Sequence, residues 1–223
     1  MRLANVLVLA DSAFPAGTFG HSFGLETAIV EGRVASAEGM RAWIYSYALH
    51  ALATLDAAAL VLALRDGVDA KALDELVSAS LVAAEVRAAN AQLARSTLDA
   101  YEAMGLSSVA IEAYRASLCA DGGHGVHALA IGLGYAAAGV AWPDALRAYF
   151  SSTFAALVSV GTRAIPLGQR AAARLLWKLR PLVEEAASKA ERVNSVDDLC
   201  AQAFGCEIDA MRHAELDGRM FVS

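Results

Sequence analysis

Proline is scarce in this sequence, with only 4 among 223 residues, so few positions interrupt a helix. Charged residues are also few: they make up 19% of the chain, whereas 57% is hydrophobic. Intrinsic disorder needs the opposite balance, so we expect the chain to fold. The three cysteines, Cys119, Cys200 and Cys206, are an odd number without the spacing of a disulfide framework. This usage is typical of a reducing compartment and predicts a cytoplasmic protein.

Motifs that bind nucleotides, nucleic acids or metals are also missing. The sequence has no G-x-x-x-x-G-K-[ST] loop, which argues against a Walker-type NTPase. The net charge of −6 argues against a general nucleic-acid binder. Two groups, His124 with His127 and Cys200 with Cys206 and His213, have the spacing of no closed metal motif. We therefore predict no cofactor and no metal site.

Residues that favour helices dominate the composition: alanine accounts for 51 residues and leucine for 28. Alternating Val, Ile and Thr runs, internal repeats and low-complexity linkers do not occur. The sequence therefore predicts an all-α fold, with residues 1–223 forming one domain, a bundle of roughly eight to ten helices.

Apolar spacing predicts where several of these helices lie. We expect a first core helix over residues 1–11, a central helix over 41–65, and helices over 69–105 and 107–118. A turn over 121–125 should precede an uncharged, buried helix ending at Gly139. That stretch is too short and too rich in Ala and Gly for a membrane span.

Prolines and glycines mark the later helices. Trp142-Pro143 predicts the start of one helix, and Gly161 should loosen its end. Pro166 should open another, which Pro181 should kink or end.

Gly20-His21-Ser22-Phe23-Gly24 matches the G-x-S-x-G nucleophile elbow, so a serine hydrolase is the alternative function. The elbow needs a buried strand before the serine, and the sequence offers none. We instead expect Ser22 to cap the helix that contains Glu26. Asp56, alone on its apolar helix, should be hydrogen-bonded in the core.

Two further segments each allow two interpretations. Arg170, Arg174 and Lys178 form an i, i+4, i+8 row, which either binds an acidic partner or pairs with acids such as Glu184 and Glu185. The C-terminal tail, residues 214–223, ends in apolar side chains where termini are usually polar. It either packs on its own bundle or becomes ordered on a partner.

Several stretches, in order, resemble one protein family. Residues 9–17, Leu-Ala-Asp-Ser-Ala-Phe-Pro-Ala-Gly, followed by His21-Ser22 and Gly24-Leu25-Glu26, closely resemble the N-terminal signature of the UreF family of urease accessory proteins. The similarity continues at Glu85, Arg87 and Gln92, over residues 123–139 and 165–169, and around residues 219–221. Thr18, Phe23 and Ala172-Ala173 depart from the family pattern.

This resemblance implies a non-catalytic assembly factor, typically dimeric, that acts without a cofactor, a nucleic acid or a membrane. Such a protein joins the accessory protein UreD, also called UreH, to the nickel-carrying GTPase UreG, and helps to load nickel into apo-urease. A chain of this kind works through binding energy, by favouring one conformation or nucleotide state of the GTPase.

The resemblance also implies which residues bind partners. A surface facing the GTPase is expected at Asp11, Ser12, Phe14, Pro15, Gly17, His21, Ser22 and Glu26. Arg219, Met220 and Phe221 are expected to contact the second accessory protein. Independently of the resemblance, the charged row adds Arg170 and Arg174 as candidates for binding an acidic partner.

Overall fold

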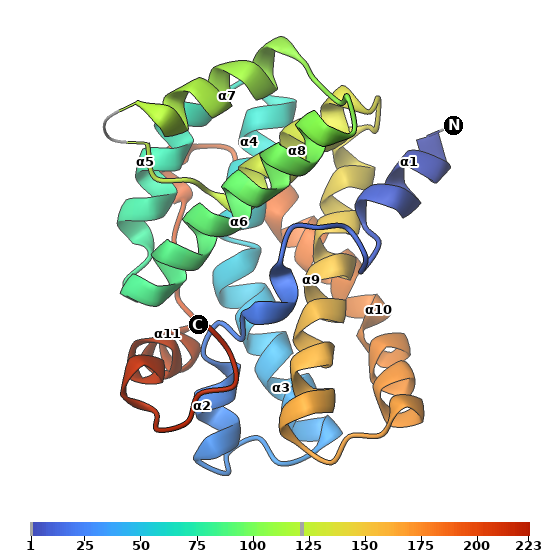
Figure 1. The fold of residues 1–223 in the computed structure, drawn as a ribbon, viewed down its shortest axis with the longest axis vertical. Coiled ribbons are helices and arrows are strands. Elements are labelled where there is room, and N and C mark those ends of the chain that lie inside the picture. Colours follow the sequence, from blue (N-terminus) through green and yellow to red (C-terminus); the bar gives the residue numbers. More distant parts are fainter. Residues whose placement is uncertain (1, 121–122) are drawn as a thin grey trace.

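Helices account for all the regular secondary structure in the computed structural model, which describes residues 2–120 and 123–223 (Figure 1). This confirms the all-α prediction. Within those ranges there are eleven α-helices, one more than the upper end of the expected number: α1 (Arg2–Leu9), α2 (Leu25–Val30), α3 (Ala37–Tyr47), α4 (Asp56–Arg65), α5 (Ala70–Ser80), α6 (Ala84–Ala103), α7 (Val109–Cys119), α8 (His127–Ala137), α9 (Trp142–Ala164), α10 (Gln169–Glu191) and α11 (Phe204–Arg212). Residues 1, 121 and 122, which include part of the predicted turn, lie outside the described residues.

The central apolar segment is two helices rather than the single one predicted. A π-helical turn, Ala48–Leu52, ends the first part, and α4 begins after a bend of 44°. The chain near residue 200 binds the groups freed at this break: the amide of Cys200 donates to the carbonyl of Thr54 at 3.0 Å, and the Thr54 hydroxyl donates to the carbonyl of Cys200 at 2.6 Å. Because these partners are distant in sequence, local periodicity could not reveal the break.

The predicted helix over residues 69–105 is also interrupted, by the extended segment between α5 and α6. Arg87 donates to the carbonyls of Leu81 and Val82 at 2.5 and 3.0 Å, which satisfies backbone groups that the break leaves free.

Gly161 and Pro181 do not end their helices. α9 continues through Gly161, where an added Cβ would lie 2.0 Å from the sulfur of Met40. This glycine therefore allows close packing of α9 on α3. α10 continues through Pro181, with buried Leu179 and Leu182 on either side of it. Packing against the bundle retains the helix beyond the proline.

The first helix is not a core helix, contrary to the prediction. Leu3 and Leu7 of α1 are 70% and 62% exposed, and Figure 1 shows α1 projecting from the bundle. Its attachment includes a 2.8 Å hydrogen bond from the Asn5 side chain to the carbonyl of Ala138.

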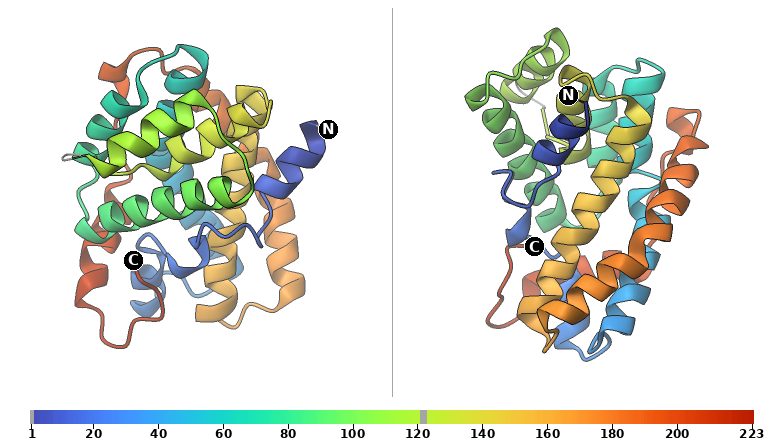
Figure 2. Two further views of the ribbon diagram at one scale, coloured as in Figure 1. Left: turned by 45° about the horizontal axis from the view of Figure 1, so that its top comes forward. Right: turned by 90° about the vertical axis from the view of Figure 1, so that its right-hand side faces the viewer.

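The core lies around α4 and α8. Residues 57–62 of α4 are almost completely buried, as are most residues of the uncharged α8, so the buried-helix prediction is confirmed. Gly132 and Gly134 let α8 approach Leu60 and Tyr101 more closely than a side chain would allow. α9 and α10 pack side by side along the bundle (Figure 2).

In the described part of the chain, no single helix has both the length and the apolar character of a membrane span. The bent pair formed by residues 37–52 and α4 meets that test only when taken together.

Candidate functional site

The N-terminal loop, residues 11–26, is shaped by residues with left-handed backbone conformations. Gly17 and Gly24 have φ of 86° and 92°, which glycine adopts without steric cost. Phe23 has φ of 52°, and it is the one non-glycine residue with positive φ in the described ranges. The loop therefore has a left-handed backbone at a residue that carries a bulky side chain.

Gly24 also sets the distance between the loop and α11. A Cβ added at Gly24 would lie 2.6 Å from the amide nitrogen of Ala210 and 2.9 Å from the carbonyl oxygen of Cys206. Only a residue without a side chain fits there, and the start of α2 can therefore rest directly on α11.

The C-terminal tail closes over this loop. The amide of Val222 donates to the carbonyl of Gly20 at 2.7 Å, and the amide of Phe23 donates to the carbonyl of Ser223 at 3.1 Å. The amide of Ser22 donates to the same oxygen, and Nδ1 of His21 lies 2.9 Å from the Ser223 hydroxyl. Figure 1 shows the C-terminal end of the chain beside the segment leading into α2.

Glu26 connects the tail to the bundle. Its carboxylate accepts hydrogen bonds from the amides of Met220 at 2.7 Å and Phe221 at 3.1 Å, and lies 2.8 Å from Nε2 of His213. Nδ1 of His213 lies 2.7 Å from Glu85, and Arg219 donates to the other oxygen of Glu85 at 2.5 Å. We call these four side chains, Glu26, His213, Glu85 and Arg219, the tail network.

The tail presents its side chains alternately inward and outward. Phe221 is 4% exposed, and the guanidinium of Arg163 lies 4.4 Å from the centre of its ring. Met220 and Val222 are 56% and 60% exposed. Of the two open possibilities for the tail, packing on its own bundle is therefore the one observed at Phe221 and Ser223, while two apolar side chains are left facing outward.

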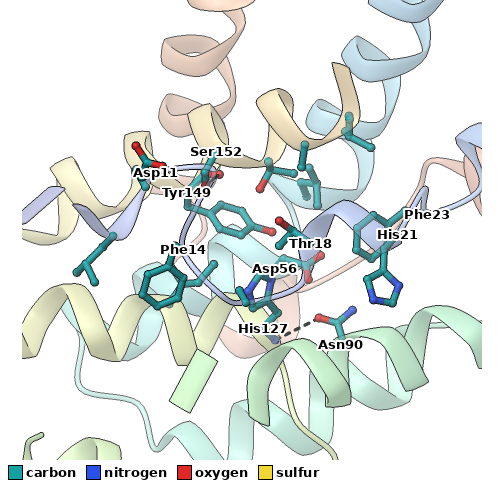
Figure 3. A pocket seen from close by; sticks show the side chains of 18 of the residues that line it. Asp11, Phe14, Thr18, His21, Phe23, Asp56, Asn90, His127, Tyr149 and Ser152 are labelled. Atoms are coloured by element: carbon teal, nitrogen blue, oxygen red, sulfur yellow. Dashed lines mark hydrogen bonds between the residues drawn. The ribbon is translucent and has the colours of Figure 1, made fainter. Parts of the chain in front are cut away.

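A cavity of about 70 Å³ lies beneath the N-terminal loop (Figure 3). His21, Asp56 and His127 contribute to its lining, together with Tyr149 from α9. Its volume is sufficient for several water molecules. The cavity therefore has polar groups from both the loop and the core helices.

Burial shifts the pKa of two ionisable groups of this cavity in the direction that favours their neutral forms. It lowers the pKa of His127 to about 3 and raises the pKa of Asp56 to about 7. Asp56 lies in the core, as predicted, and its own backbone amide partly offsets the effect of burial on its pKa. The His127 amide donates to the Asn90 side chain at 3.2 Å, whereas its Nε2 has no hydrogen-bond partner within the described residues.

The residues considered as metal ligands have other surroundings. Within residues 2–120 and 123–223, no three His, Cys, Asp or Glu side chains gather as a metal site would require. Cys206 is buried, and His213 lies between two carboxylates of the tail network.

Ser22 is not the cap of α2, and its surroundings differ from those of a nucleophile elbow. It is fully buried, and its hydroxyl lacks a hydrogen-bond partner in the part of the chain that is described. Gly24 is the N-cap residue of α2, and Ser22 contributes its backbone carbonyl, which accepts from the amide of Leu25 at 3.1 Å. Since no strand precedes Ser22 among the described residues, the structure lacks the elbow on which the hydrolase alternative depends.

The predicted partner-binding residues of the loop fall into two groups. Asp11, Ser12, Pro15 and Gly17 are exposed, whereas Phe14 is half-buried with its ring 5.6 Å from that of Tyr101. The other three, His21, Ser22 and Glu26, are buried against the tail rather than lying on the surface as expected.

The remaining candidates lie on the tail and on α10. Arg219 and Met220 are exposed, Phe221 is buried, and Arg170 and Arg174 are exposed on α10. Sequence reasoning did not bring Glu85 and His213 together with Glu26. Those contacts join residues 128 and 187 positions apart, for which spacing along the chain gives no signal.

Comparison with known proteins places the chain among urease accessory proteins. The family model described as UreF matches residues 34–180. The protein named Urease accessory protein UreF of Paenarthrobacter aurescens (strain TC1) is 36% identical over 215 residues, covering 96% of this chain and 95% of that protein. The protein of the same name from Bacillus sp. (strain TB-90) is 32% identical over 231 residues, covering 100% and 99%. The chain belongs to the UreF family.

Proposed function

We propose that this protein is a non-catalytic adaptor that joins UreD (UreH) to the GTPase UreG and couples the state of the GTPase to nickel insertion into apo-urease. It acts in the cytoplasm as a homodimer. The observation that carries the proposal is the closure of the N-terminal loop by the tail. The Glu26 carboxylate accepts hydrogen bonds from two tail amides, so this buried residue holds the exposed surface of the loop and tail in a defined position.

The exposed residues of this region are suited to binding proteins. Asp11 supplies charge, Pro15 restricts the loop, and Met220 and Val222 present apolar side chains on a segment tied down by backbone hydrogen bonds. A surface fixed before binding loses less conformational entropy when the partner arrives. We assign the exposed loop residues to the GTPase and the outer side of the tail to UreD.

The buried residues act indirectly in this proposal. His21, Ser22 and Glu26 position the tail, and Arg219 links it to α6 through Glu85. Phe221 anchors the tail in the bundle, which leaves its neighbours Met220 and Val222 to meet the partner.

Assembly with purified UreD and UreG tests the proposal, with complexes measured by size exclusion and light scattering. We expect a ternary complex with the unaltered chain and loss of UreD from a chain lacking residues 218–223. Met220→Glu should weaken UreD binding while leaving the tail backbone in place. Asp11→Ala with Ser12→Ala should weaken UreG binding instead.

Glu38→Ala is the matched control, because Glu38 is exposed on α3, where it pairs with Arg41. Complexes that form equally well with every variant would contradict the assigned surfaces. A chain that binds neither UreD nor UreG would refute the adaptor function. Ester turnover that disappears in Ser22→Ala would instead restore the hydrolase alternative.

A further inference from the structure

The outer side of the first half of α10 carries a concentration of positive charge. Arg170, Arg174 and Lys178 are all exposed, and in residues 2–120 and 123–223 none of them lies within ion-pair distance of a carboxylate. The acids that could neutralise this row are used elsewhere: Glu184 pairs with Arg147, and Glu185 accepts from the hydroxyl of Tyr45. The alternative in which this row pairs with acids such as Glu184 and Glu185 is therefore not what the structure shows.

An exposed tryptophan lies on the same side of the helix. Trp177 follows Arg170 by seven residues and Arg174 by three, which places the three side chains along one helical face. Its side chain is 65% exposed, whereas Trp43 is buried and Trp142 is half-buried. The guanidinium of Arg180 lies 3.3 Å from the centre of the indole ring, so a fourth cation adjoins this face.

The bundle does not require these side chains for packing. α10 meets its neighbours through Leu175, Leu179 and Leu182, which are 2% to 3% exposed. The opposite face is directed outward, at the edge of the molecule in Figure 2. We define the cationic face as Arg170, Arg174, Trp177, Lys178 and Arg180.

We propose that the cationic face binds an acidic surface of another protein, with carboxylates paired to the arginines and an apolar recess that receives Trp177. Arginine and tryptophan are the residue types that most often dominate binding energy at protein interfaces. Arginine also matches carboxylates with two parallel hydrogen bonds. The charge of this face is opposite to that of the chain as a whole, which is −6. Complementary charge would therefore orient the partner toward α10.

Other occupants suit this face less well. A second copy packed symmetrically through it would bring identical cations together. A nucleic acid would meet a cationic stretch of only about 15 Å along the helix, because Glu184, Glu185 and Glu191 continue the same helix. The proposal does not depend on the loop and tail surface, so the two can be tested separately.

The test uses the full chain, with poly-L-glutamate as the acidic probe. Binding is followed by the fluorescence of Trp177. This signal is obtained by subtracting the fluorescence of the Trp177→Phe variant from that of the unaltered chain. We expect binding that protects Trp177 from acrylamide quenching and weakens as salt increases. Arg170→Glu with Arg174→Glu should weaken it at least about tenfold, an effect of the size expected for two desolvated arginines. Lys71→Glu with Arg41→Glu, the same charge change at exposed positions elsewhere, should have little effect.

Two further measurements complete the test. The same variants are titrated with purified UreD and UreG, where we expect the double variant to bind one of them at least about tenfold more weakly. Equal poly-L-glutamate binding by the double variant and its control would overturn the proposal. Tighter binding of duplex DNA than of poly-L-glutamate, or loss of self-association as the only effect of the double variant, would overturn it in favour of those occupants. Failure of the unaltered chain to bind UreD or UreG, with poly-L-glutamate binding lost in the double variant, would refute the adaptor function alone.

Discussion

Glu26 and His213 are 187 residues apart in the sequence, yet the Glu26 carboxylate lies 2.8 Å from Nε2 of His213 and both residues are buried. The other ring nitrogen of His213 faces Glu85 at 2.7 Å. The tail network therefore places the His213 ring between two carboxylates, and the Glu26 carboxylate also accepts hydrogen bonds from two tail amides.

Removing Glu26 should be strongly destabilising. We expect Glu26→Ala to lower the free energy of unfolding by about 3–5 kcal/mol, because it leaves His213 and two amides without their buried partner. Urea denaturation monitored by circular dichroism measures this change. Glu38→Ala removes a surface pair and should cost no more than about 1 kcal/mol. Equal losses in the two variants would show that the tail network contributes little to stability.

Shortening the tail should affect the loop selectively. A chain lacking Val222 and Ser223 loses the carbonyl that accepts from the amides of Ser22 and Phe23, and it loses the amide that donates to the carbonyl of Gly20. We expect faster hydrogen exchange in a peptide covering residues 20–26, with little change in α4. Unchanged exchange in that peptide would mean that the tail does not hold the loop.

Gly24 should not accept a side chain. In Gly24→Ala, the new methyl group would lie 2.6 Å from a backbone nitrogen of α11 and require a φ of 92°. We expect a loss of about 2–4 kcal/mol in the free energy of unfolding, from steric displacement and backbone strain together. Gly32→Ala is the control, since its φ is 74° but nothing lies within 4 Å of an added Cβ. It should cost only about 1 kcal/mol, the strain component.

Asp56 should make stability depend on pH. Burial raises its pKa from 3.8 to about 7, so the folded chain holds this proton more tightly than the unfolded chain. Its contribution to stability is therefore complete below about pH 4 and is lost as the pH rises to about 7.

Asp56→Asn removes that loss. The stability of this variant relative to the unaltered chain should rise across the same interval, by up to about 4 kcal/mol, and stay constant above it. Denaturation at pH 4, 5.5, 7 and 8.5 measures the difference. A difference that does not change with pH would contradict a raised pKa at Asp56.

Composition was sufficient to predict the all-helical fold, and spacing located α8 and the start of α9. Neither composition nor spacing was sufficient to locate the breaks within the predicted helices over residues 41–65 and 69–105. The π-helical turn at Ala48–Leu52 is stabilised by Cys200 and Gln202, and periodicity within the helix contains no information about that contact. Gly161 gave a misleading signal for a similar reason, because its role depends on Met40 in α3.

The candidate site was predictable as a set of residues but not as an arrangement. Resemblance selected Glu26 and Arg219, but it did not indicate that Glu26 is buried or that Arg219 reaches it through Glu85 and His213. Burial of a carboxylate depends on partners supplied by the tertiary fold. The exposure of Trp177 was not predicted either, although its spacing from Arg170 and Arg174 along the helix carries that signal.

The hydrogen bonds between the tail and residues 20–26 also affect the order of events during synthesis. The N-terminal loop leaves the ribosome long before His213, Met220 and Ser223 have been made. These residues complete the loop through the His213 side chain, the Met220 amide and the Ser223 hydroxyl. A nascent chain arrested before residue 213 leaves the Glu26 carboxylate and the amides of Ser22 and Phe23 without these partners. Completion of the loop therefore waits until residues 213–223 have been made, and shorter nascent chains cannot display it in finished form.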